Sequence, residues 1–119
     1  MAAPNLKNPT TVTGKTVGYA VTTSMAAALS NSAASGKALK VNTVYCANVD
    51  GTAAADITLQ VWDGTTGYEL AHTITVPADA TQVLVSRDAY VYLEEGQSLR
   101  AQASAAGDLE LVISYEDIS

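Results

Sequence analysis

The sequence predicts an all-β protein, an antiparallel β-sandwich that is jelly-roll-like and has about eight or nine strands. Short apolar segments recur at roughly ten-residue spacing, with turn residues between them. In several segments apolar and polar residues alternate strictly, which is the period of a half-buried strand and not of a helix. Two Asp-Gly pairs, which favour hairpin turns, interrupt the stretch 37–76, and we expect that stretch to form an antiparallel meander.

The first 16 residues lack apolar periodicity and are rich in Asn, Thr and Pro. Pro4 and Pro9 block helix formation and favour an extended path. We therefore predict an extended N-terminal arm over residues 1–16 and one β-sandwich domain over residues 17–119. The Thr-rich tract Asn8 to Thr13 is suited to adding a strand to an exposed sheet edge, and the arm is expected to become ordered when it docks.

The predicted domain begins where strict alternation begins, with Val17, Tyr19 and Val21 on one face. The segment Met25 to Leu29 is Ala-rich, which favours helix, but it is short and a loop-like sequence follows it, so a short strand is expected. The segment Leu39 to Val49 changes phase half-way. A β-bulge near Asn42-Thr43 would reconcile its two halves.

The remaining strands follow at similar spacing. Ile57, Leu59 and Val61 share one face, which is predicted to face the core. The run Val83 to Val85 is continuously apolar, so it is expected to be covered on both faces. The other predicted strands contain Tyr68 to Val76, Tyr90 to Leu93, Leu99 to Ala103 and Leu109 to Tyr115.

The predicted core is thin for a chain of 119 residues. The sequence has no Phe and one Trp, and much of its hydrophobic 48% is Ala, which buries little area per residue. Because small cores often need oligomeric contacts, we expect a homo-oligomer, a dimer or a trimer. No apolar stretch approaches the ~20 residues of a membrane span, and the start has no hydrophobic signal core. A soluble protein made in a cytoplasm, with no membrane partner, is expected.

Charge is divided unevenly along the chain. The first 49 residues contain Lys7, Lys15, Lys37 and Lys40 and no acid, whereas all twelve carboxylates lie from Asp50 onward. The two halves could interleave in a folded sheet and neutralise each other, or a basic N-terminal segment could reach over an acidic surface on a sister subunit or another protein. A sequence pI near 4.4 and the lack of a basic-aromatic cluster argue against nucleic-acid binding.

The sequence contains no motif of a hydrolase, a P-loop or dinucleotide-binding protein, or a zinc protease. Cys46 lies in an apolar run, where a buried thiol is expected; it could pair with His72 only if the fold joined them, and no third orienting group is evident. His72 is in phase with apolar residues, which indicates a buried or interfacial imidazole. The acidic pairs Glu94-Glu95 and Glu116-Asp117 lack the ligand spacing of a calcium loop and are expected to be solvated turn residues. We expect no enzyme activity, metal or cofactor.

Trp62 is in phase with Asp56, Thr58 and Gln60, so it is expected to point away from the core. An indole on the polar side of a strand indicates an interface or a platform on which a sugar stacks. Burial under a loop or under the N-terminal arm is the alternative.

Three parts of the chain form a recognisable pattern: the start NLKNPTTVTGKTVGYAVTTS, the middle VYCANVDGTAAADITLQVWDGTTGYELAHTITVPADA and the end VYLEEGQSLRAQASAAGDLELVISYEDIS. In these three parts the chain resembles small structural proteins of tailed bacteriophages, including cyanophages. None of these stretches is a catalytic motif, and no functional residue follows from the resemblance. It implies an all-β virion component, such as a capsid decoration (cement) protein or a neck or tail accessory protein.

On this resemblance we expect a non-enzymatic virion protein that binds the assembled phage head and stabilises the capsid. Its partners would be the major capsid protein or other virion proteins. A neck or tail accessory protein is one alternative, and a glycan-binding adhesin that uses Trp62 is another. The residues expected at the interface are Lys7, Thr10, Thr11, Lys15, Trp62 and His72.

Overall fold

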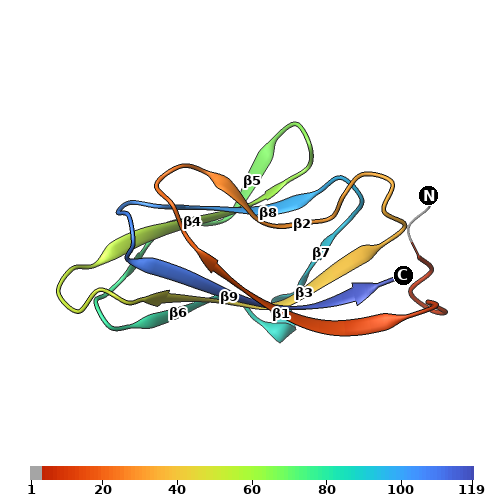
Figure 1. Cartoon of the computed structure of the whole chain (residues 1–119), viewed down its shortest axis with the longest axis horizontal. Coiled ribbons are helices and arrows are strands. Elements are labelled where there is room, and N and C mark those ends of the chain that lie inside the picture. Colours follow the sequence, from red (N-terminus) through yellow and green to blue (C-terminus); the bar gives the residue numbers. More distant parts are fainter. Residues whose placement is uncertain (1–3) are drawn as a thin grey trace.

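The computed structural model describes residues 4–119, which form a β-sandwich of two antiparallel sheets (Figure 1). The predicted all-β fold is confirmed. The strands are β1 (Val12–Ala20), β2 (Ala26–Ser30), β3 (Ala38–Asn48), β4 (Ala55–Trp62), β5 (Gly67–Val76), β6 (Thr81–Val85), β7 (Val91–Leu93), β8 (Ser98–Ala103) and β9 (Leu109–Ile118), with a short 3₁₀ turn η1 (Arg87–Ala89). Residues 1–3 of the predicted arm lie outside the described residues.

The first sheet, called sheet A, has the strand order β1-β9-β3-β6, and β7 also pairs with β3. The second, sheet B, has the order β2-β8-β4-β5. In Figure 1 sheet A is the lower layer and sheet B the upper layer. The last strand of the chain therefore lies inside sheet A, between the first strand and the third.

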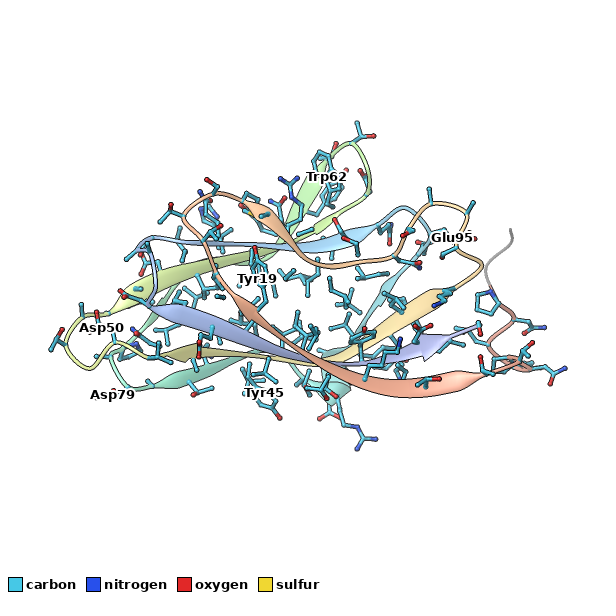
Figure 2. All side chains as sticks on the ribbon, viewed as in Figure 1. Tyr19, Tyr45, Asp50, Trp62, Asp79 and Glu95 are labelled. Atoms are coloured by element: carbon cyan, nitrogen blue, oxygen red, sulfur yellow. The ribbon has the colours of Figure 1, made fainter. Side chains whose placement is uncertain are left out.

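The core fills the space between the two sheets. Strand alternation turns Ile57 and Leu59 of β4 inward from sheet B, and Leu111 and Ile113 of β9 inward from sheet A, and all four are fully buried. Burial of each such side chain stabilises the fold by about 1.5–3 kcal/mol. Tyr19 of β1 also enters the space between the layers, where it is partly buried (Figure 2). The largest fully buried side chains are those of Ile, Leu and Val, together with Cys46.

Asn48 is a buried polar residue at the end of the sandwich where Figure 2 labels Asp50. Its Nδ2 donates hydrogen bonds to the carbonyl oxygens of Ala53 at 3.0 Å and Val76 at 2.9 Å. Its Oδ1 accepts one from the backbone N–H of Asp50 at 2.9 Å. One side chain of sheet A thus holds the end of β5 in sheet B.

Asn31 occupies a corresponding position at the other end of the sandwich, and it is also buried. Its Nδ2 donates to the carbonyl oxygens of Lys37 at 2.9 Å and Leu93 at 3.0 Å. Its Oδ1 accepts a hydrogen bond from the Ser35 hydroxyl. Because buried amides are costly unless they are hydrogen-bonded, these two asparagines fix the loops around them.

Several local predictions are confirmed. β3 shifts its register against β9 between Val41 and Thr43, so the bulge lies where it was predicted. β4 and β5 form an antiparallel hairpin around Asp63-Gly64, and Gly64 has a positive φ of 100°, which glycine adopts without steric cost. The Ala-rich segment after Met25 is a strand, β2.

The predicted meander over residues 37–76 is wrong at its first turn. β3 belongs to sheet A and β4 to sheet B, so the segment around Asp50-Gly51 carries the chain from one sheet to the other instead of closing a hairpin. The Asp50 carboxylate stabilises this crossing, because its Oδ1 accepts hydrogen bonds from the N–H and the hydroxyl of Thr52, both at 2.9 Å. The same hydrogen bonds hold the pKa of Asp50 below its ordinary value.

The first strand starts earlier than predicted. β1 begins at Val12, which lies opposite Ile118 in β9. Residues 12–16 therefore belong to the sheet, although they were assigned to the arm. Their β-branched residues suit a strand, but Gly14 interrupts the apolar pattern that would have revealed it.

The prediction that Val83 to Val85 is covered on both faces is wrong, and the apolar face indicated around His72 is partly exposed, because β5 and β6 are irregular edge strands. Val83 of β6 is 47% exposed, because a register shift against β3 turns Val85 inward and Val83 outward. In β5 two register shifts against β4 and a positive φ at Thr73 disturb the alternation. Tyr68 and Leu70 consequently lie exposed on what the sequence indicated as an apolar face.

Candidate interaction surface

The outer face of sheet A carries a row of apolar side chains that point to solvent. Val83 of β6 lies opposite Tyr45 of β3, and Tyr45 lies opposite Val112 of β9. Their exposed fractions are 47%, 41% and 41%, respectively. Figure 2 shows Tyr45 pointing away from the interior. We call these three residues the apolar row.

An aromatic cluster lies on the same face, at the end of sheet A formed by β7. Tyr92 is opposite Lys40, and Lys40 is opposite Glu116 in β9. The rings of Tyr90 and Tyr92 meet edge to face, with centroids 5.5 Å apart, and the Lys40 ammonium lies 4.3 Å from the Tyr90 centroid. Glu116 accepts a hydrogen bond from Asn42 at 3.0 Å and lies 3.8 Å from Lys40. The cluster is therefore ordered by its own contacts before any partner binds.

The sequence prediction missed the apolar row, although the signal was present. Tyr45 and Val112 have the opposite parity to the buried residues of their strands, so alternation alone places them outside. Parity could not show that they are neighbours, because β3, β6 and β9 are distant in the sequence.

Trp62 lies on the outer face of sheet B, as predicted, at the β5 end of the molecule (Figure 2). Its indole is partly buried, and the Arg100 guanidinium lies 4.5 Å from the ring centroid. Arg100 also donates to the carbonyl oxygen of Met25 at 3.4 Å. One face of the indole is therefore already covered by an arginine.

His72 is exposed, with 69% of its side chain accessible, so the prediction of a buried imidazole is wrong; the interfacial alternative stays a prediction. Its Nδ1 lies 3.1 Å from Oε1 of Glu69. Cys46 is fully buried in sheet A, and burial raises the pKa of its thiol to about 11. The fold does not bring Cys46 and His72 together as nucleophile and base.

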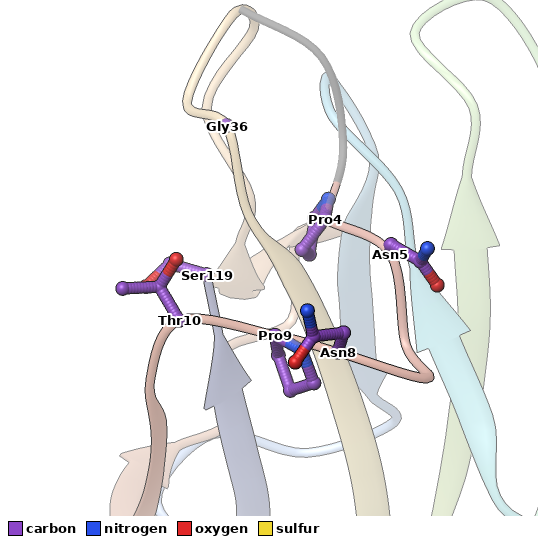
Figure 3. A pocket seen from close by; sticks show the side chains of 7 residues that line it. All are labelled: Pro4, Asn5, Asn8, Pro9, Thr10, Gly36 and Ser119. Atoms are coloured by element: carbon purple, nitrogen blue, oxygen red, sulfur yellow. The ribbon is translucent and has the colours of Figure 1, made fainter.

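The segment before β1 contains three of the predicted interface residues, and all three are exposed: Lys7, Thr10 and Thr11. The N–H groups of Thr10 and Thr11 both donate to the carbonyl oxygen of Ser119, and the N–H of Ser119 donates to Thr11. An open hollow of about 400 Å³ lies between this segment, Gly36 and Ser119 (Figure 3). Among the residues that the structure describes, no charged side chain lines it.

Lys15 is held within its own chain. Its Nζ lies 3.1 Å from Oδ2 of Asp117, and the Nζ of Lys37 lies 3.2 Å from the same oxygen. The hydrogen bond to Asp117 raises the pKa of Lys15. Partial burial alone would raise the pKa of Asp117, but the two lysines together outweigh burial and lower it.

These contacts decide between the two interpretations of charge. Lys15, Lys37 and Lys40 from the first half of the chain pair with Asp117 and Glu116 from the second half, so the two halves interleave. The prediction that Glu116-Asp117 is a solvated turn is wrong, because both residues belong to β9.

The fold does not bring the predicted interface residues together on one surface. Trp62 and His72 lie on sheet B, whereas Lys15 lies in the edge strand of sheet A. Over residues 4–119 no group of His, Cys, Asp and Glu side chains has the arrangement of a metal site. In the same range no helix is long and apolar enough to cross a membrane.

No family model and no curated protein matches the chain. Among solved structures, two crystal structures of a pentameric capsid protein isolated from metagenomic phage sequences are similar to it. Both are 19% identical and cover 85% of this chain, with TM-scores of 0.44 and 0.43. The match covers 59% and 63% of those chains, so this chain spans about three-fifths of their length. At this similarity no function is transferred.

Proposed function

We propose that this chain is a non-enzymatic structural protein of a bacteriophage virion, which binds the assembled head as a decoration or cement protein. The observation that carries the proposal is the apolar row on the outer face of sheet A, because contiguous exposed apolar residues on a rigid sheet are typical of protein interfaces. The resemblance of the sequence to small phage structural proteins supports the class of partner.

The proposed mechanism is mechanical. The sandwich measures 48 × 26 × 20 Å, so one face can lie across the junction of neighbouring capsid subunits. Surface buried across a junction must be exposed again before the shell can expand or rupture, and its free energy adds to the stability of the shell.

The size of the patch indicates that it does not act alone. Full burial of the apolar row together with Tyr90 and Tyr92 removes roughly 300–400 Å² from water, which contributes on the order of 8–10 kcal/mol. Association costs about 4–15 kcal/mol. The two amounts are comparable, so stable attachment needs further contacts.

Two sources of further contact are proposed. The exposed N-terminal segment with Lys7, Thr10 and Thr11 would dock on the major capsid protein or another virion protein. A homo-oligomer, a dimer or trimer, would present several copies of the apolar row to the shell at once. The protein would be made in the host cytoplasm and act in the virion.

Retention on purified heads tests the proposal. Tyr45→Glu should reduce retention at least tenfold, because it places a charge in the centre of the apolar row. Tyr68→Glu is the matched control, since Tyr68 is an exposed tyrosine of sheet B. The proposal fails if Tyr45→Glu is retained like the wild type, or if Tyr68→Glu is lost equally.

Purified virions and heads also test the alternative location at the neck or tail. A neck or tail accessory protein would be retained on complete virions but not on tailless heads. Labelled protein seen by electron microscopy distinguishes a shell-wide distribution from one at a single vertex.

A further inference from the structure

The free edge of β1 differs from the other sheet edges. β1 has nine residues, and its register with β9 continues without a shift from Val12 to Ala20. The other edge strands are short or irregular: β2 and β6 have five residues and one register shift each, β7 has three residues, and β5 has two shifts. Proteins commonly protect sheet edges by shortness or bulges, and β1 has neither protection.

The outward backbone groups of β1 belong to its even-numbered residues. At one end of the ladder Thr11 and Ser119 exchange N–H···O bonds, and at the other end the N–H of Val21 donates to Leu109. Bonding to a given neighbour alternates along an antiparallel strand, so the odd residues between these ends bond to β9. The N–H and C=O groups directed away from β9 are those of Val12, Gly14, Thr16, Gly18 and Ala20.

The side chains at these positions leave the edge open. All five residues are exposed, and none is larger than valine. Gly14 and Gly18 do not have positive φ, and a Cβ would meet nothing within 4 Å at Gly14 and only the Leu111 carbonyl oxygen at 4.0 Å at Gly18. The fold of one copy therefore does not require glycine there. Glycine within a strand is typical of places that another backbone approaches.

We propose that β1 pairs antiparallel with β1 of a second copy, around a twofold axis at Thr16, so that the two A sheets become one continuous sheet. This inference deepens the homo-oligomer in the proposed function and rests on it. We assign a second copy of this chain as the partner of the β1 edge, because the strand is complementary to itself in this register.

The self-complementarity follows from the sequence of β1. With Thr16 opposite its symmetry mate, Gly14 lies opposite Gly18, and Val12 lies opposite Ala20. The five outward residues on each strand then form about ten backbone hydrogen bonds across the edge. A Thr–Thr pair is favourable on a sheet, and the backbone bonds do not depend on large side chains.

Charge is compatible with the same register. Lys15 is the only charged residue of β1, and it lies opposite Val17 of the second copy, so no like charges face each other. Its ammonium is already held at 3.1 Å by Asp117 of its own chain. The interface is isologous, as in most dimers, and it sets both apolar rows on one extended face.

Light scattering after size exclusion of the full chain is the first test. The wild type should be a dimer whose fraction rises with concentration. Thr16→Pro should make it monomeric, because it removes an outward N–H and leaves the ladder to β9 intact. Far-UV circular dichroism and the melting of the monomer confirm that the variant is folded. A wild type that is monomeric at all concentrations, or a dimer that persists in a folded Thr16→Pro, overturns the proposal.

A charge exchange tests the register. Gly14→Lys with Gly18→Lys places lysines opposite lysines in the dimer and should weaken self-association at least tenfold at low salt. Gly14→Lys with Gly18→Glu places opposite charges there and should restore it. Position 14 lies opposite Glu116 of its own chain and carries lysine in both variants, and position 18 lies opposite Val112, so no directly opposite residue of the monomer favours one variant over the other. Equal self-association of the two variants would refute the register.

Disulfide trapping tests the same pairing by a measurement that does not depend on the affinity of the dimer. Thr16→Cys should form a disulfide-linked dimer under mild oxidation, because paired residues lie about 5.5 Å apart at Cα. Ala20→Cys should not, since it lies opposite Val12. The native Cys46 is buried and gives no background. If the wild type is monomeric and the β1 variants lose retention on heads, the β1 edge binds a strand of the capsid instead of a second copy. If the wild type is a dimer that is not retained on heads, only the virion role is refuted.

Discussion

At the scale of single residues, the buried amide of Asn48 connects parts of the chain that the sequence keeps apart. It joins the end of β3 to the carbonyl oxygens of Ala53 and Val76, which precede β4 and end β5. A hydrogen bond contributes about 1 kcal/mol net, but a buried group left without a partner costs about 1–3 kcal/mol. The amide thus holds the two sheets together at one end.

We predict that Asn48→Leu lowers the free energy of unfolding by about 2–4 kcal/mol, because it removes the hydrogen bonds that the Asn48 amide donates to both carbonyl oxygens. Urea unfolding followed by circular dichroism measures the change. Asn42→Leu is the control, since Asn42 is only partly buried and bonds to an accessible Glu116; a loss under about 1 kcal/mol is expected. If the two variants lose similar amounts of unfolding free energy, the buried hydrogen bonds of Asn48 do not have the stabilising role given to them here.

Trp62 separates the proposed function from the adhesin alternative. Because Arg100 covers one face of the indole, we predict that Trp62→Ala lowers stability by about 1 kcal/mol through the lost cation–π contact and packing, with no glycan binding to lose. The measurements are thermal unfolding and a glycan array with the wild type. A reproducible array signal that disappears in Trp62→Ala would favour the adhesin.

At the scale of elements, the segment before β1 is attached to the body by few contacts. Within residues 4–11 the bonds to the body are those of Thr10 and Thr11 to Ser119. The proposal that this segment becomes ordered on docking requires that it contribute little to the isolated protein.

We predict that deletion of residues 2–9 leaves the melting temperature nearly unchanged and reduces retention on heads at least tenfold. Deletion of residues 2–16 is the contrast, since it also removes half of β1 and should lower the melting temperature clearly. Lys7→Glu should weaken retention in a salt-dependent way without a change in stability. Unchanged retention after the shorter deletion would rule out this segment as an anchor.

Local patterns in the sequence predict the strands well, but not their partners. Alternation located the inward face of Ile57 and Leu59, and the change of phase located the bulge before Thr43. An Asp-Gly pair indicates a change of direction, but it does not tell a hairpin from a crossing between sheets, so Asp50-Gly51 was misassigned. Parity also fails where bulges disturb an edge strand, as around Thr73.

The candidate surface was harder to predict than the fold, because it is made by register. Val83, Tyr45 and Val112 become one row only through pairing of three strands that the sequence separates. Of the predicted interface residues, Lys15 satisfies its charge within its own chain, and Trp62 is stacked by Arg100. The sequence can single out an unusual side chain, but an interface depends on which side chains the pairing of strands makes adjacent.

At the scale of the whole molecule, Asp117 links three parts of the fold and makes its stability depend on pH. It joins β9 to Lys15 of β1 and to Lys37 before β3, and its side chain is only 11% exposed. Its pKa is lowered from 3.8, so its contribution is complete above that value and is lost as pH falls through the folded value. The raised pKa of Lys15 acts in the opposite sense, and its contribution is lost as pH rises through a value above 10.5.

We predict that Asp117→Asn lowers stability at pH 7 by about 1 kcal/mol, a modest amount because both lysines are nearly half exposed and screened. It should also flatten the loss of stability below about pH 4. Melting temperatures between pH 2.5 and pH 9 measure both effects. Glu110→Gln is the control at an exposed carboxylate of the same strand. If Asp117→Asn loses stability at acid pH as steeply as the wild type, Asp117 is not the source of that loss.

The position of β9 between β1 and β3 governs the order in which the protein can form during synthesis. A ribosome delivers β1 and β3 long before Leu109 emerges, and until then sheet A lacks the strand that joins them. A nascent chain that stops short of β9 therefore exposes inward-facing residues such as Val44 and Cys46 without their neighbours Ile113 and Leu111. Sheet A can therefore be completed only after β9 has left the ribosome, and we expect partial products that lack β9 to be prone to aggregation.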